Sequence, residues 1–309
     1  MSCLKWRKEQ TTKLLATGLA LPRLEVTNEE LALILPPDVV ERKTGICSRR
    51  IAIDESVSEL GAEAVLQACQ SADISIEAIQ HLICSTNSGE QWVPPTVARV
   101  ARRLGYRGPG FDVNAACAGS ATILRLALSL SSPTAIVATE RVTPFVSRLA
   151  GDWPSVIFGD GAGAAIIDPG KSPVGWVGGM NPDGHDWIQV PMNEHCRMNG
   201  PKLLESAVPM MREALTGAAQ QCGLRPQDLD IIIPHQANRR IIEACMQEMN
   251  ISSDRVVITI DHFGNTSSAS ILMALASANN SKRLQRGQWI GFVAFGAGII
   301  WEALVTRLE

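Results

Sequence analysis

Hydrophobic residues in this chain gather into short runs of strand length, separated by longer segments with helical spacing. Apolar runs lie at 14–21, 134–140, 230–234 and 289–295, and several of them end at glycine or proline. The segment 118–128 instead repeats its apolar side chains every three or four residues, as one face of a helix does. Strands that alternate with helices predict an α/β fold.

The apolar run nearest the N-terminus allows two interpretations. It follows basic residues, as the core of a signal peptide does, but Gly18 interrupts it. A capping box at 27–30 then predicts the start of a helix. We therefore expect a first strand at 14–21, a turn at Pro22 and a cytoplasmic protein. The stretch 289–301 is too short to span a membrane and predicts a strand, a glycine turn and a second strand.

The chain contains an internal repeat. Residues 63–88 align with residues 213–238 without a gap, and each copy has the pattern of a helix, a turn and a buried strand. Residues 111–128 then align with 260–277 after a slip of one residue, each copy being a strand end, a small-residue turn and a helix. A third strand follows in each half. Such a duplication predicts two similar α/β units.

The two units are predicted to span residues 1–170 and 171–309 and to pack about a pseudo-twofold axis. In open α/β sheets, functional residues gather beyond the carboxyl ends of the strands. Cys117 follows one predicted strand end in the first unit, and His235 and Asn265 follow two others in the second. Packing of the units would bring these three residues together.

The three residues suit acyl chemistry on a sulfur atom. Cys117 precedes the predicted helix 118–128, whose free backbone N–H groups favour a thiolate, so we expect its pKa to be lowered. Asn265 follows a predicted strand at 256–261, nearly opposite Cys117 in the repeat. His235 and Asn265 both offer hydrogen-bond donors for a thioester carbonyl that becomes an enolate. The alternative is a cysteine that only fills a small space.

Composition narrows the possible partners. The net charge of −3 and a pI near 6.0 give no reason to expect nucleic acid. The eight cysteines form no CxxC pair, which favours free thiols. His185 and His195, with Asp186 and Cys196, match no standard metal-site spacing, so we expect neither metal nor cofactor. The motif GDGAGA at 159–164 fits a dinucleotide pattern, but a strand-like segment follows it, which predicts a glycine-rich turn near the active site.

Several longer motifs occur in order along nearly the whole chain. They are ERKTGICSRRIA (41–52), DVNAACAG (112–119), FGDGAGAA (158–165), PHQANRR (234–240), DHFGNTSSAS (261–270) and FGAGIIWEALV (295–305). Together they resemble the signatures of β-ketoacyl-acyl-carrier-protein synthase III, a family of the thiolase superfamily. The resemblance implies a thiolase-like, five-layered αβαβα fold built from two related halves, and a homodimer. It also implies acyl and malonyl thioesters as substrates and an acyl carrier protein as partner.

The resemblance assigns a role to each residue. Cys117 is acylated by a primer thioester. His235 and Asn265 promote decarboxylation of a malonyl thioester and stabilise the enolate, which attacks the acyl group to give a β-ketoacyl product. The Cys117 N–H and the Phe295–Gly298 loop form the oxyanion hole. The backbone groups of that loop belong to Gly296, Ala297 and Gly298.

Four positions differ from the family pattern. Val39 stands where the family has tryptophan, Lys43 and Asp152 where it has arginine, and Ala297 where it has glycine. In the family, the tryptophan and the second arginine enclose the adenine of coenzyme A. Both are absent here, although Trp153 is adjacent. The pattern indicates a specialised relative, of secondary metabolism more than of fatty-acid initiation.

Alternatives remain for the partner and for the reaction. Arg240 matches a basic family position and is a candidate for carrier-protein docking. Alternatively, it lies on a solvated helix face and has no partner. His81 is expected in a core or at a sheet edge, His262 in a structural role, and Leu204 near the acyl chain. Two other functions stay open: an acyltransferase that passes the acyl group to oxygen or nitrogen, and a non-catalytic partner subunit.

Overall fold

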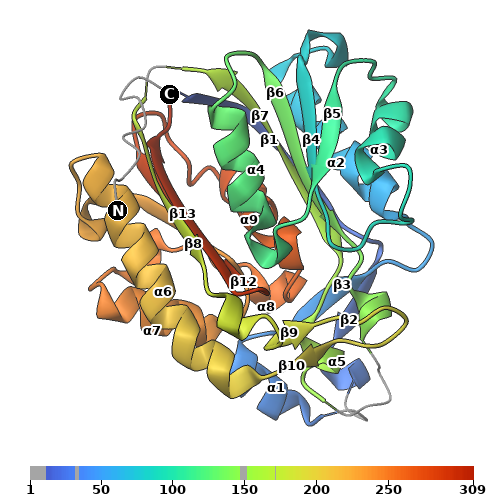
Figure 1. Ribbon diagram of the computed structural model, residues 1–309, viewed down its shortest axis with the longest axis vertical. Helices are drawn as coiled ribbons and strands as arrows, with labels where there is room; N and C mark the ends of the chain where they lie inside the picture. The colour runs from blue at the N-terminus through green and yellow to red at the C-terminus, as the bar shows by residue number, and fades with distance from the viewer. Residues whose placement is uncertain (1–11, 32–34, 147–151, 171) are drawn as a thin grey trace.

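The structure is a computed structural model that describes residues 12–31, 35–146, 152–170 and 172–309. Two β-sheets and three layers of helices alternate, which confirms the predicted αβαβα order (Figure 1). The division of the chain at residue 170 stays a prediction.

The first sheet has five strands, in the order β1-β7-β6-β4-β5. Strands β6, β4 and β5 run parallel to one another, and β1 and β7 pair antiparallel at the other side. Their bounds are β1 Thr12–Ala20, β4 His81–Ser85, β5 Gly110–Val113, β6 Thr134–Glu140 and β7 Gly161–Pro169.

The second sheet has four strands, in the order β11-β12-β13-β8, and only β11 and β12 are parallel. Its strands are β8 Val174–Met180, β11 Ile231–Pro234, β12 Trp289–Gly296 and β13 Ile300–Arg307. As predicted, 289–301 forms a strand, a glycine turn and the start of another strand.

Helices cover both sheets and fill the space between them. Helices α4 and α9 lie in the middle layer, α2 and α3 cover the first sheet, and α6 and α7 cover the second (Figure 1). The bounds are α2 Val57–Ala72, α3 Thr96–Leu104, α4 Gly119–Leu128, α6 Gly200–Gln221, α7 Arg239–Glu248 and α9 Ser270–Asn280. No described helix has both the length and the hydropathy needed to cross a bilayer.

The middle layer explains why its helices are so apolar. Helix α9 buries nearly every residue as far as Ala278, because sheets face it on both sides, and it shares a continuous core with Leu124 of α4, Ile136 of β6 and Phe292 of β12. A helix that is hydrophobic on all sides is stable only in such a buried position.

Small elements gather at one end of the molecule (Figure 1). They are β2 Leu24–Thr27, α1 Pro37–Thr44, β3 Ser48–Ile51, α5 Pro154–Ile157, β9 Ile188–Gln189, β10 Arg197–Met198 and α8 Ile260–Phe263. The capping box at 27–30 is present as hydrogen bonds between Thr27 and Glu30, but it opens only a three-residue 3-10 turn, Glu29–Leu31. The helix expected there begins instead at Pro37.

The strand predicted at 256–261 is wrong. Only an isolated bridge joins Val256 to Ile232, and helix α8 begins at Ile260. The cause is the buried side chain of Gln236, which donates to the Val257 carbonyl and accepts from the N–H groups of Thr259 and Ile260. These side-chain bonds replace the ladder that a neighbouring strand would supply.

The repeat is real in the structure, but its second part has a different register from the predicted one. The 3-10 turns Ala116–Ala118 and Ser267–Ala269 precede α4 and α9 respectively. Ala116 and Ser267 both have positive φ, 48° and 50°, and their N–H groups donate to Asn114 and Asn265. Asn265 therefore corresponds to Asn114, and Cys117 corresponds to Ser268.

Candidate functional site

Cys117 lies in the 3-10 turn that connects β5 to α4. Its neighbour Ala116 has the left-handed backbone that non-glycine residues rarely adopt, and such strain is typical of functional sites. The Asn114 side chain holds this turn by accepting the Ala116 N–H at 3.2 Å. The turn presents the partly buried Cys117 side chain at the start of a helix, as the sequence predicts.

The glycine loop after β12 packs directly on Cys117. A Cβ at Gly296 would lie 2.8 Å from the Cys117 nitrogen, so only glycine allows this approach. The backbone at Ala297 and at Cys117 acts to lower the pKa of the Cys117 thiol, so both lie close to the sulfur. Gly298 has φ +118°, a left-handed value that favours glycine. The loop expected to form the oxyanion hole thus lies directly against the Cys117 turn.

His235 follows β11 and is buried, with 2% of its surface exposed. Burial lowers its pKa to about 4, so the imidazole is neutral at physiological pH. Ser270 Oγ accepts the Gln236 N–H and lies 2.6 Å from His235 Nδ1. When the Ser270 hydroxyl donates to Nδ1, the ring proton lies on Nε2, which then acts as a donor.

Asn265 is held by its backbone and by its side-chain oxygen. Its N–H donates to the Ile157 carbonyl and its own carbonyl accepts the Gly159 N–H. Its Oδ1 accepts the Ser267 N–H at 2.9 Å, which leaves the amide nitrogen to act as a donor. Gly159 belongs to the glycine-rich turn predicted at 159–164, but only its first two residues lie outside strand β7, which begins at Gly161 where a dinucleotide site would have a helix.

The segment 265–270 contacts both Cys117 and His235. The Ser267 hydroxyl lies 3.6 Å from the Cys117 sulfur, and Ser270 contacts His235. Residues 265–270 thus contribute Asn265 and contact both of the other predicted residues. The three predicted residues are therefore assembled around a single turn.

The lowered pKa predicted for Cys117 is wrong. Burial raises the pKa of the Cys117 thiol to about 11, and the charge of Glu140 adds to this. Hydrogen bonds from Ser267 and from the N–H groups of Ala297 and Cys117 act in the opposite direction but do not prevail. The sequence showed the helix start but not the depth of burial.

Sequence reasoning missed three polar residues near the sulfur: Asn87, Glu140 and Ser267. Asn87 Nδ2 donates to Glu140 Oε1 at 2.8 Å and to Ser267 Oγ at 3.0 Å. Glu140 ends β6 and Asn87 follows β4, so the rule that found Cys117 applies to both. Ser267 was hidden among the small residues beside Asn265.

The positions that depart from the family pattern lie on the small elements. Val39 is half-buried on α1 and Lys43 is exposed there. Asp152 accepts hydrogen bonds from Ser155 at the start of α5, and Trp153 is 37% exposed. A surface hollow of about 360 Å³ lies between α1 and the start of α7. Its lining residues are Asp38, Glu41, Arg42, Gly45, Cys47 and Arg239.

The remaining candidates lie outside this cluster. His81 begins β4, where its Nδ1 contacts Ser132, and the side chain of His262 is exposed. His185 and His195 are exposed, and the described residues contain no group of three or more side chains fit to hold a metal ion. Leu204 is 44% exposed on α6.

Comparison with known proteins places this chain among enzymes. Residues 219–308 match the family described as 3-oxoacyl-[acyl-carrier-protein] synthase III C terminal. A β-ketoacyl-[acyl-carrier-protein] synthase III of Rhodospirillum centenum is 36% identical, and the match covers 95% of this chain and 98% of the relative.

Solved structures agree in fold. The 3-oxoacyl-[acyl-carrier-protein] synthase III of Aquifex aeolicus superposes with a TM-score of 0.92 at 30% identity, covering 96% of this chain and 99% of that one. The priming β-ketosynthase of the R1128 polyketide pathway gives 0.91 at 30% identity, covering 100% and 99%.

The thiolase-like fold, with a cysteine at a helix start in its first half, defines the class as acyl-transferring condensing enzymes. The chain belongs to the β-ketoacyl-[acyl-carrier-protein] synthase III family.

Proposed function

We propose that this enzyme loads an acyl group onto Cys117 and condenses it with a malonyl thioester. In loading, the sulfur bonds to the acyl carbonyl carbon and the donor thiol leaves with the cysteine proton. The malonyl carboxylate then leaves as CO2, and its electron pair forms an enolate. The enolate carbon attacks the acyl carbonyl, the bond to Cys117 breaks, and the sulfur regains a proton.

The observation that supports this proposal is the contact of Cys117 and of a neutral His235 with the turn that carries Asn265. Two neutral donors, the His235 Nε2–H and the Asn265 amide, suit the oxygen of an enolate, which gains charge only in the transition state. A protonated histidine is not required, so the low pKa of His235 is compatible with the reaction.

The central test is intact-mass analysis after incubation with acyl-CoA and acyl-carrier-protein thioesters. The wild type should gain one acyl mass and Cys117→Ala should gain none. Cys47→Ala is the matched control, because Cys47 is the exposed thiol in the surface hollow and should not carry the label. Labelling of Cys117→Ala would refute the proposal. Release of the acyl group by an amine or alcohol, but not by a malonyl thioester, would favour the O- or N-acyltransferase.

The half-reactions should separate in an Asn265→Ala variant. Loading of Cys117 should persist, while CO2 release from the malonyl thioester should fall by about 10²-fold, the usual effect of removing one oxyanion donor. His235→Ala should behave in the same way. Equal loss of both half-reactions in Asn265→Ala would mean that the residue is only structural.

The donor is proposed to be a carrier-bound acyl group, and the pathway a specialised one. Val39 offers no aromatic face, and Asp152, which Ser155 holds in place, presents a negative charge where a coenzyme A phosphate would be repelled. Arg240 is exposed on α7, where an acidic carrier protein could dock. R1128's priming ketosynthase shows that polyketide enzymes share this fold.

The donor preference can be tested by kcat/KM for one acyl group on both carriers. Arg240→Glu should weaken the carrier-bound donor and leave the CoA ester unchanged. Arg286→Glu is the matched control, because this exposed arginine precedes β12 at the end of the strand away from Gly296. Equal use of both donors by the wild type would refute the preference.

The enzyme is also proposed to be a homodimer that joins through β5. This strand ends its sheet, its outer edge pairs with no strand in the described ranges, and Phe111 on it is 44% exposed. The neighbouring loop exposes Trp92 and Val93 by 83% and 81%. Exposed edges are normally covered, and large apolar side chains on a surface mark interfaces.

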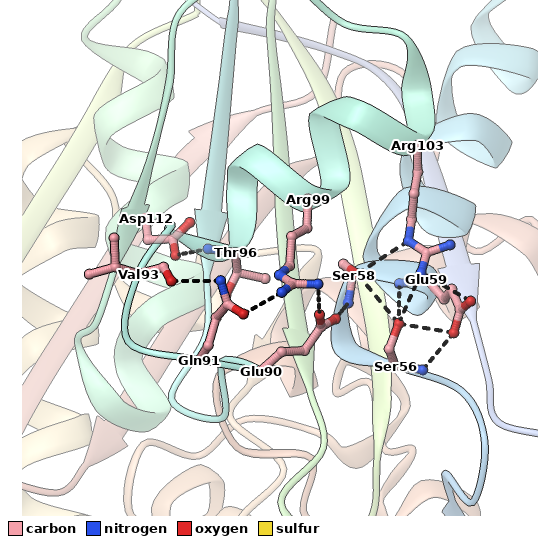
Figure 2. A network of polar contacts seen from close by, with 10 residues as sticks. All are labelled: Ser56, Ser58, Glu59, Glu90, Gln91, Val93, Thr96, Arg99, Arg103 and Asp112. Atoms are coloured by element: carbon pink, nitrogen blue, oxygen red, sulfur yellow. Dashed lines mark hydrogen bonds and ion pairs between the residues drawn. The ribbon is translucent and has the colours of Figure 1, made fainter.

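The loop that carries Trp92 and Val93 is held firmly. Figure 2 shows that Glu90 pairs with Arg99 at 3.0 Å and accepts the Ser58 N–H, while Gln91 contacts Arg99 and the Val93 carbonyl. A preformed surface loses little entropy when a second copy binds. Sedimentation velocity should give a dimer for the wild type and monomers for Phe111→Arg; a monomeric wild type would refute the assembly.

A further inference from the structure

The buried polar cluster beside Cys117 is formed by Glu140, Asn87 and Ser267. Glu140 has no exposed surface and Ser267 is 6% exposed. Glu140 comes from the end of β6, Asn87 from the segment after β4, and Ser267 from the turn before α9. The cluster therefore connects the first sheet to the turn that carries Asn265.

The direction of its hydrogen bonds can be derived. Glu140 Oε1 accepts the backbone N–H of Asn87 at 3.1 Å, so this oxygen is an acceptor whether or not the carboxyl group is protonated. The Asn87 side chain, 2.8 Å from the same oxygen, must then present its amide nitrogen to it. The second amide hydrogen donates to Ser267 Oγ at 3.0 Å.

Ser267 Oγ consequently accepts from Asn87 and keeps its own proton for another partner. The Cys117 sulfur, 3.6 Å away, is the acceptor at hydrogen-bond distance. The backbone of Ser267 has φ +50°, and its N–H is fixed by Asn265 Oδ1 at 2.9 Å, so the backbone is held beside the sulfur while Asn87 holds the hydroxyl. A rare backbone conformation that is held by several bonds is typical of active sites.

We propose that Ser267 is a further catalytic residue, whose hydroxyl donates to the Cys117 sulfur while Asn87 and Glu140 act as positioning residues. This inference rests on the proposed acyl-cysteine function. The hydrogen bond stabilises negative charge on sulfur, which develops both when the thiolate attacks the donor and when it leaves in the condensation. A thioester sulfur is a weak acceptor, so the bond is strong only at these two stages.

The test is the alkylation rate of Cys117 by iodoacetamide, followed by peptide mass between pH 7 and 10. Loss of a hydrogen bond to a charged group shifts a pKa by about one unit, so Ser267→Ala should react about tenfold more slowly at each pH below the thiol pKa. Two titratable groups interact through their charge with the Cys117 sulfur, Glu140 and Cys196, and both remain in the variant.

Ser85→Ala is the matched control. Ser85 is buried, and its hydroxyl has no hydrogen-bond partner among the residues that the structure describes. Ser85 lies against Gly119, two positions after Cys117, but makes no bond to the sulfur. Cys117 in Ser85→Ala should therefore be alkylated at the wild-type rate. Asn87→Ala provides a second variant and should slow alkylation in the same direction, since the Ser267 hydroxyl is then free to turn away.

The half-reactions supply an independent readout. Ser267→Ala should slow acyl loading about tenfold but leave CO2 release from the malonyl thioester near the wild-type rate, because its backbone N–H still holds Asn265. The proposal would be overturned if Cys117 in Ser267→Ala were alkylated at the wild-type rate, or if both half-reactions were lost equally. Alkylation needs no acyl substrate, so this failure is distinct from failure of Cys117 to accept an acyl group.

Discussion

The contact between Gly296 and Cys117 gives the sharpest prediction about the site. In Gly296→Ala, the new methyl group would lie 2.8 Å from the Cys117 nitrogen, 3.0 Å from its Cβ and 3.2 Å from the Ala118 nitrogen. Carbon atoms normally stay about 3.5 Å from such neighbours, so the end of β12 and the Cys117 turn must separate by roughly half an ångström or more. Two of the three contacts are backbone atoms, which cannot rotate away.

Two consequences follow from that separation. Overpacking of this kind costs about 1–3 kcal/mol of unfolding free energy. The movement also displaces the Cys117 turn relative to the end of β12, and these two segments carry the proposed oxyanion donors. Because loss of one oxyanion donor lowers a rate by about 10²-fold, we expect acyl loading to fall by roughly 10-fold to 100-fold.

The assay combines thermal unfolding with intact-mass measurement of the loading rate. Gly200→Ala is the control, because a Cβ at this first residue of α6 meets nothing within 4 Å. Wild-type stability and loading in Gly296→Ala would refute the argument that close backbone contact shapes the site. Lost stability with normal loading would confine the contact to a structural role.

Three further predictions concern ionisation. Because burial raises the pKa of the Cys117 thiol to about 11, its alkylation rate should still be rising at pH 9 to 10, and a plateau below pH 8 would contradict the structure. Glu140→Gln removes the charge that raises this pKa but keeps an oxygen that accepts from Asn87, so Cys117 should be alkylated faster than in the wild type at equal pH; slower alkylation in a folded variant would oppose that sign. The folded-state pKa of His235, about 4, is below the ordinary 6.5, so the unfolded chain binds the extra proton and stability is lost as pH falls from 6.5 to 4. The free energy of unfolding should therefore fall by up to about 3 kcal/mol more in the wild type than in His235→Gln, measured by denaturant titration, and parallel curves would show that His235 is accessible to protons.

The strand ends could be predicted because they depend on local patterns, whereas the order of layers was implied only by the family resemblance. Strand β12 is an apolar run bounded by glycine, and Cys117 and His235 each follow such a run. The strand expected before Asn265 failed because a distant side chain, Gln236, bonds the Val257 carbonyl and the N–H groups of Thr259 and Ile260. The spacing of apolar residues within one segment does not show whether a side chain elsewhere will bond the backbone of that segment.

The pKa of Cys117 and the role of Ser267 failed to emerge from the sequence for a related reason. A helix start is visible in the order of residues, whereas the surroundings of Cys117 include segments far away in sequence, such as Gly296 at the end of β12. Likewise, the cluster of Glu140, Asn87 and Ser267 combines three segments that no short motif connects. The sequence identified the chemistry of the individual residues but not their surroundings.

The paired turns before α4 and α9 suggest how a duplicated protein divided its work. Both copies retain the asparagine that holds the turn and the residue with positive φ, and both could display a nucleophile at the next position. In one copy that position is Cys117, which remains accessible. In the other it is Ser268, which is fully buried with its hydroxyl bound to Glu140 at 2.6 Å. The two equivalent turns therefore differ in chemistry: one presents the sulfur that is proposed to carry the acyl group, and the other ties its hydroxyl to a buried carboxyl group.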